Sequence, residues 1–128
     1  MRLNQITLPA PDMEASGAFW RLLGFRPIVV EAHYCRFLAP EGETTLSLHG
    51  EGPAGEAAVY LEIDTLDEDV ARLSAAGVVF EGAPVDQSWL WREAWTRDPA
   101  GNRVCLYFAG VNRLDPPWRV APDAQEQA

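Results

Sequence analysis

The sequence predicts an α+β fold built from two successive modules, each with the element order strand, helix and three strands. Short runs of alternating apolar and polar residues predict strands throughout the chain. Two amphipathic segments predict helices, which end at Gly24 and Gly77. The second half of the chain repeats the element order of the first, and this internal repeat decides the fold class. Each helix covers one face of its sheet and leaves the other face free.

The first module is predicted to occupy about residues 1–50. A helix is expected over 13–23, because Asp12 is a good N-cap and Gly24 is a good C-terminal stop. Alternation predicts the strands of this module, which we place at 2–8, 25–31, 34–38 and 44–49.

A Gly- and Pro-rich linker at 50–55 precedes the second module, which is predicted over about 56–109. Its helix should run from Thr65 to about Ala76, with Glu68 completing a capping box. Its strands are expected at 57–63, 78–81, 89–97 and 103–109. A single folded domain would therefore span residues 1–111, followed by a proline-rich tail at 112–128 whose last residues we expect to be disordered.

Charge and composition exclude several classes of partner. The net charge of −9 disfavours nucleic acid and anionic membrane surfaces. No apolar run reaches the roughly 18 residues of a membrane span, and MRLNQITLPAPD lacks the apolar stretch of a signal peptide, so we expect a cytoplasmic protein. The two cysteines, Cys35 and Cys105, form no CxxC pair, and a structural disulfide is not expected in a reducing compartment.

Two stretches resemble the vicinal oxygen chelate superfamily, which includes glyoxalases, extradiol dioxygenases, fosfomycin-resistance enzymes and bleomycin-resistance proteins. NQITLPAPDMEASGAFWRLLGF at 4–25 is similar to the opening strand and helix of that family. RDPAGNRVCLY at 97–107 is similar to its DPxGN turn and closing strand. The resemblance covers nearly all of residues 2–109. It implies paired βαβββ modules curling around a central cavity, and it supports a homodimer that would close the open sheet edges and faces.

Catalytic members of this superfamily hold a divalent metal with one His, Gln or Glu from each of four strands. By resemblance, the corresponding positions here hold Gln5, Ser47 (or His49 if the register shifts by two), Ala58 and Cys105. Only Gln5 is a typical ligand, and a thiolate does not suit Mg²⁺ or Mn²⁺. We therefore expect neither a metal nor another cofactor. Cys105 is then a small apolar filler, because a reactive thiol needs a stronger base or cation than its neighbour Arg103 alone supplies.

The segment SWLWREAWTR at 88–97 is the most unusual local stretch. Three tryptophans repeat at even spacing, which would place them on one face of one strand. They could form a stacking wall for a flat ligand. The alternative is a subunit interface, or a platform covered by the tail that carries Trp118. Together with the cavity-facing residues that the resemblance implies, the candidate ligand-binding residues are Gln5, Ser47, His49, Tyr60, Trp89, Trp91, Glu93, Trp95, Arg103, Cys105 and Tyr107.

These observations favour a metal-independent protein that binds a small organic molecule, in the manner of bleomycin-resistance and other drug-sequestering members. An aromatic molecule would suit the tryptophans. One alternative is a lyase or dioxygenase-like enzyme with a divalent metal and an atypical ligand set. Another is a metal-independent enzyme that uses Glu93, Tyr60 or His49 as acid or base. His49, at a strand end, is equally consistent with a surface residue, and Glu93 with a solvated charge.

Overall fold

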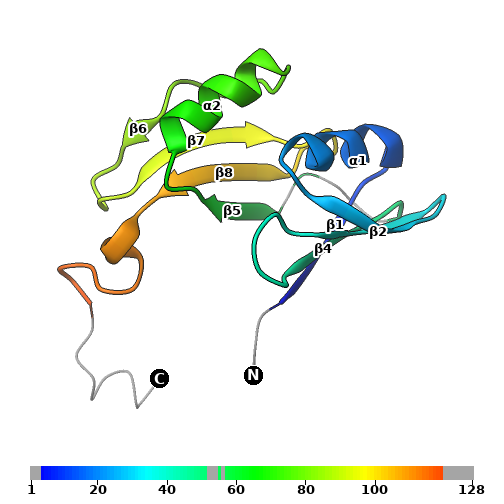
Figure 1. The fold of residues 1–128 in the computed structure, drawn as a ribbon, viewed down its shortest axis with the longest axis horizontal. Coiled ribbons are helices and arrows are strands. Elements are labelled where there is room, and N and C mark those ends of the chain that lie inside the picture. Colours follow the sequence, from blue (N-terminus) through cyan, green and yellow to red (C-terminus); the bar gives the residue numbers. More distant parts are fainter. Residues whose placement is uncertain (1–3, 52–54, 56, 120–128) are drawn as a thin grey trace.

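The computed structural model describes residues 4–51, 55 and 57–119, and it confirms the two predicted βαβββ modules (Figure 1). The first module consists of β1 (Gln5–Pro9), α1 (Met13–Leu22), β2 (Arg26–Val30), β3 (Tyr34–Leu38) and β4 (Thr45–His49). The second consists of β5 (Ala58–Glu62), α2 (Leu66–Ala75), β6 (Val85–Asp86), β7 (Arg92–Arg97) and β8 (Arg103–Phe108). A short 3₁₀ helix, η1 (Gly110–Arg113), follows β8.

Each module forms its own four-stranded sheet with the same topology. The strand orders are β1-β4-β3-β2 and β5-β8-β7-β6, and the first and last strands of each module pair in parallel. The other pairs are antiparallel. Figure 1 shows α1 and α2 on the same side of the molecule, above their sheets. The opposite face of each sheet is therefore covered by neither α1 nor α2.

The hydrophobic core lies between the helices and the sheets. Trp20 of α1 is fully buried and meets Phe19 and Phe25 edge to face, with ring centroids 5.3 and 5.0 Å apart. In β8, Val104 and Leu106 point into this core, whereas Cys105 and Tyr107 belong to a separate cluster on the other face. The alternation read from the sequence thus separates a core face from an open face in the closing strand.

The ends of the helices follow the predicted chemistry with one exception. The Asp12 carboxylate accepts a hydrogen bond from the Ala15 amide (3.0 Å), as an N-cap should. Gly24 and Gly77 adopt φ of +92° and +106°, the left-handed conformation that favours glycine after a helix. The predicted capping box at Thr65 is wrong: its hydroxyl donates to Asp69 (3.1 Å) and caps no backbone group.

The DPxGN turn joins the two modules. The Asn102 side chain is fully buried, and its amide donates to the Asp98 carboxylate (3.0 Å) and to the Pro9 carbonyl at the end of β1 (3.2 Å). Its side-chain oxygen accepts from the Gly55 amide (3.3 Å). A turn in the second module is therefore bonded directly to a strand of the first.

Two predicted strands of the second module differ from the structure. Residues 78–81 form no strand, although the Glu81 amide donates to the Trp95 carbonyl (2.8 Å); the short strand β6 comes after Gly82 and Pro84 instead. The predicted strand over 89–97 begins only at Arg92. Residues 87–91, which we call the Trp turn, close on themselves through Leu90 N–H···O=C Gln87 (3.0 Å) and Gln87 N–H···O=C Trp91 (2.8 Å).

At the two ends of the chain, β1 begins at Gln5, and residues 2 and 3 of the strand predicted at 2–8 lie outside the described residues. Residues 120–128, where disorder was predicted, also lie outside them. Trp118 is 57% exposed, so the tail does not bury this ring over the other tryptophans. Within the described residues, no helix combines the length and the apolarity that a membrane crossing needs.

Candidate functional site

A hollow of about 530 Å³ lies on the open face of the second sheet. β5, β7 and β8 contribute side chains that alternate with core residues, so they point away from α2. The Trp turn contributes the rest. We call this site the aromatic hollow; its lining consists of Tyr60, Gln87, Trp89, Trp91, Glu93, Trp95 and Arg103.

Three rings of the aromatic hollow, together with Tyr107 beneath them, form one packed cluster. Tyr60 meets Trp91 and Trp95 edge to face, at centroid distances of 6.1 and 5.3 Å. Trp91 stacks on Tyr107 at 4.5 Å with an interplanar angle of 13°. Tyr107 is buried beneath, so Trp91 has one face supported by the protein and lines the hollow. Such preorganised rings offer stacking area with little ordering cost.

Glu93 holds two of these rings in place. Its side chain is only 4% exposed, and its two carboxylate oxygens accept the indole N–H groups of Trp89 (2.8 Å) and Trp95 (3.0 Å). Trp89 sits in the Trp turn and Trp95 in β7, so the carboxylate ties the turn to the strand. Glu93 is thus no solvated strand charge.

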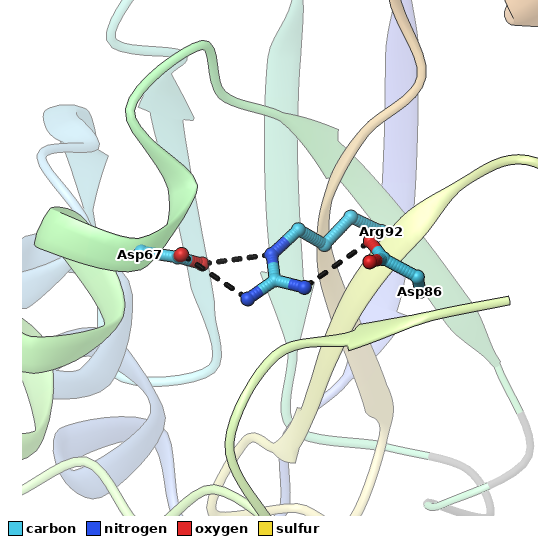
Figure 2. A network of polar contacts seen from close by, with 3 residues as sticks. All are labelled: Asp67, Asp86 and Arg92. Carbon is cyan, nitrogen blue, oxygen red and sulfur yellow. Dashed lines mark hydrogen bonds and ion pairs between the residues drawn. The ribbon is translucent and has the colours of Figure 1, made fainter.

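A third interaction fixes the turn from outside, as Figure 2 shows. Arg92, at the start of β7, donates to both carboxylate oxygens of Asp67 in α2 (3.0 and 3.1 Å) and to Asp86 in β6 (3.1 Å). These hydrogen bonds raise the pKa of Arg92. Because Asp86 and Arg92 flank the Trp turn, the guanidinium links the two ends of the turn to each other and ties Arg92 to the helix.

Cys105 and Tyr107 lie under the hollow. Cys105 has no exposed surface, and burial, aided by the nearby charge of Glu93, raises its pKa to about 12. Burial also raises the pKa of Tyr60 and of Tyr107. Since the thiolate is the nucleophile, Cys105 is inert at neutral pH. It acts as a small filler between the rings and the core.

The first sheet carries a separate polar network on its open face. The Gln5 amide donates to the Ser47 hydroxyl (2.8 Å), which is also bonded to the Tyr34 hydroxyl (2.8 Å). Arg36 donates to Tyr34 (2.9 Å), and Gln5 also bonds Thr45. The bond with Ser47, supported by the charge of Arg36, lowers the pKa of Tyr34.

The residues at the four metal positions do not form a fitting donor set. Gln5 and Ser47 are bonded to one another, Ala58 has no donor atom, and Cys105 is buried as a thiol. In the part of the chain that the structure describes, no three His, Cys, Asp or Glu side chains gather where they could hold a metal ion. This donor chemistry suits neither Mg²⁺ nor Zn²⁺.

The structure divides the predicted ligand-binding residues into three groups. Six of them line the aromatic hollow: Tyr60, Trp89, Trp91, Glu93, Trp95 and Arg103. Cys105 and Tyr107 lie beneath it, whereas Gln5, Ser47 and His49 belong to the other sheet and do not line it. The prediction that three tryptophans share one strand is wrong, since only Trp95 lies in β7; the Trp turn brings Trp89 and Trp91 to the same side.

Sequence reasoning missed Gln87, Tyr34 and Arg36. Gln87 lies two residues before Trp89 and continues its spacing, which was a usable signal. Tyr34 and Arg36 alternate with core residues in β3, but their link to Ser47 depends on strand pairing that no local pattern shows.

A second hollow of about 690 Å³ lies between the modules and is lined by both. Its walls include the aliphatic side chains of Ile6, Leu46, Leu61 and Leu106. It lacks the cluster of rings around a buried carboxylate that distinguishes the aromatic hollow, which is therefore the stronger candidate site.

The family model of the glyoxalase/bleomycin resistance protein/dioxygenase superfamily matches residues 2–106. The chain belongs to this superfamily. The matched residues cover the whole first module, and they cover the second module up to Leu106 in its closing strand β8. No curated protein matches the chain.

Solved structures of this superfamily share the fold. A bleomycin-binding protein in complex with bleomycin is 24% identical, with a TM-score of 0.67 over 84% of this chain and 98% of that one. A lactoylglutathione lyase from Agrobacterium tumefaciens is 21% identical, with a TM-score of 0.75 over 86% and 95% of the two chains. A superfamily member from Nocardioides is 20% identical, with a TM-score of 0.75 over 94% and 90%.

Proposed function

We propose that this superfamily member binds a flat organic molecule in the aromatic hollow, without a metal ion, and sequesters it. The observation that carries the proposal is the set of four rings lining a hollow of about 530 Å³, two of which are held by hydrogen bonds to Glu93. This volume lies in the usual range for small-molecule sites. The bleomycin-bound neighbour supports a binding role for the fold.

The hydrogen bonds of Glu93 and the protonation of Cys105 favour a binding function over a catalytic one. Both oxygens of Glu93 already accept indole N–H groups, and Cys105 is protonated at neutral pH. A general base or nucleophile must be directed at the substrate in a reactive protonation state, whereas Glu93 is buried with its oxygens directed at the two indoles. The second candidate, a metal-dependent lyase or dioxygenase-like enzyme, is disfavoured by the donor chemistry of Gln5, Ser47, Ala58 and Cys105.

The Trp91→Ala variant should weaken binding of flat aromatic ligands. In the wild type, titration with a panel of flat aromatic drugs is expected to quench tryptophan fluorescence. The variant should lose most of that response, and its Kd should rise up to roughly tenfold, because one stacking pair contributes about 0.5–1.5 kcal/mol. Unchanged affinity for every ligand would contradict the proposal. In that case the mass of the variant in solution, measured by light scattering, decides the alternative. A fall from the mass of a dimer toward that of a single chain would place this face in a subunit interface.

The purified protein should carry no stoichiometric transition metal. Elemental analysis after purification without chelator measures this directly. Close to one zinc, manganese, iron or nickel per chain, lost on mutating Gln5 or Cys105, would favour the metal-dependent alternative.

We further propose that the protein is a cytoplasmic homodimer. Edge strands β2 and β6 expose Ile28, Val30 and Val85, and pairing with a second copy would cover these edges. Cys35 and Cys105 are both unpaired, in keeping with a reducing compartment. Light scattering coupled to gel filtration should give twice the chain mass of 14.2 kDa at micromolar concentration. The single-chain mass would refute the dimer.

A further inference from the structure

The aromatic hollow contains a buried negative charge that no cation neutralises by direct contact. Glu93 is 4% exposed, and its hydrogen-bond donors are two neutral indoles. None of the ion pairs within residues 4–51 and 57–119 includes it. Its charge acts on its neighbours, since it contributes to the raised pKa of both Tyr60 and Cys105, where the charge of Arg103 acts in the opposite direction. A buried carboxylate without a counter-ion is costly, so a positive charge placed beside it is stabilised.

The aromatic walls of the hollow also favour a positively charged ligand. The faces of indole and phenol rings attract cations, and tryptophan does so most strongly. The hollow already holds one cation in this way, because the guanidinium carbon of Arg103 lies 4.0 Å from the centroid of the Trp95 ring. Trp89, Trp91 and Tyr60 line the same space. The net charge of −9 attracts cations to the protein at longer range.

We infer that the occupant of the aromatic hollow is a flat organic cation, such as a heteroaromatic ring bearing a fixed quaternary nitrogen. The inference rests on the proposed binding function and names the class of ligand. The ring stacks on the tryptophans, and the positive charge lies beside Glu93. Arg103 is the charge that opposes this ligand, but it is exposed, and its guanidinium already lies over the ring of Trp95.

A pair of ligands that differ in charge tests the inference. N-methylacridinium carries a permanent charge, whereas acridine has the same three flat rings and is uncharged at pH 8. By calorimetric titration at that pH, the wild type should bind the cation roughly tenfold more tightly than the neutral ring, as expected for cation–π and charge contributions combined. Raising the salt concentration should lower this ratio of the two affinities, because salt screens the charge contribution.

Three variants locate the source of the preference. Glu93→Gln should reduce the ratio to threefold or less, in line with the cation–π part alone. Arg103→Gln should increase it, because one opposing charge is removed while the Glu93 contacts stay intact. Glu68→Gln is the matched control: it removes one negative charge from the exposed surface of α2 and should leave the ratio unchanged.

The outcomes separate the inference from the function on which it rests. Equal binding of the two ligands by the wild type and by Arg103→Gln would overturn the cation preference and leave the binding function standing. An equal fall in the ratio for Glu68→Gln and Glu93→Gln would assign the preference to overall charge and overturn the role of the hollow. If neither ligand binds the wild type, the proposed binding function itself fails.

Discussion

Replacing Asn102 with alanine is expected to lower the free energy of unfolding by about 3 kcal/mol. The variant loses hydrogen bonds to Asp98, Pro9 and Gly55, and it leaves the buried Asp98 carboxylate with one donor fewer. The cost is large because buried polar groups left without partners keep their full desolvation penalty. Urea unfolding followed by circular dichroism measures it.

Asn4→Ala serves as the control for this change. Asn4 is exposed, and its bonds to Thr45 use only the backbone carbonyl, so its side chain should contribute little. A difference below about 0.5 kcal/mol between Asn102→Ala and Asn4→Ala, the ordinary range for surface substitutions, would show that the DPxGN turn does not fasten the modules together.

The second large effect is expected from pH: the free energy of unfolding should fall steeply as the pH rises above about 9. The unfolded chain releases the Cys105 proton near pH 9.0, whereas the folded protein holds it to about pH 12. Between these values the unfolded state binds fewer protons, so its free energy falls relative to that of the folded state. Three pKa units correspond to about 4 kcal/mol. The raised pKa values of Tyr60 and Tyr107 act in the same direction.

Unfolding free energies measured between pH 8 and pH 11 check this expectation. Cys105→Ala should flatten the decline, even if the smaller side chain lowers stability at pH 8. Tyr60→Phe should flatten it further, because it removes one of the two phenols. A wild-type stability that stays constant over this range would mean that the rings do not exclude water from Cys105.

The repeat and the helix ends were predictable because they depend on local chemistry. Asp12 and Gly24 act through neighbours within one turn of helix, so the sequence shows both the residue and its partner. The strand expected at 78–81 failed because apolar residues there precede Gly82 and Pro84, and turn residues outweigh local hydrophobicity.

The sequence predicted most of the residues that line the site, but it did not predict the turn and the hydrogen bonds that position them. The even spacing correctly predicted that Trp89, Trp91 and Trp95 lie on the same side of the sheet. The cause differs, because a turn with Leu90 at φ +67°, and not a continuous strand, places the first two rings there. The hydrogen bonds of Glu93 to two indoles depend on that turn and could not be read from spacing. Gln5, Ser47 and His49 lie in a different sheet because β1, β3 and β4 pair with one another, and such long-range pairing cannot be read from local spacing.

The indole N–H signals in a ¹H–¹⁵N correlation spectrum test the binding site most directly. The chain has five tryptophans, and each gives one such signal. Three of these rings line the aromatic hollow, whereas Trp20 is buried in the core and Trp118 lies in the exposed tail. On titration with N-methylacridinium, the signals of Trp89, Trp91 and Trp95 should shift together and saturate, while those of Trp20 and Trp118 stay in place. Saturable binding that leaves Trp89, Trp91 and Trp95 unshifted would contradict the account.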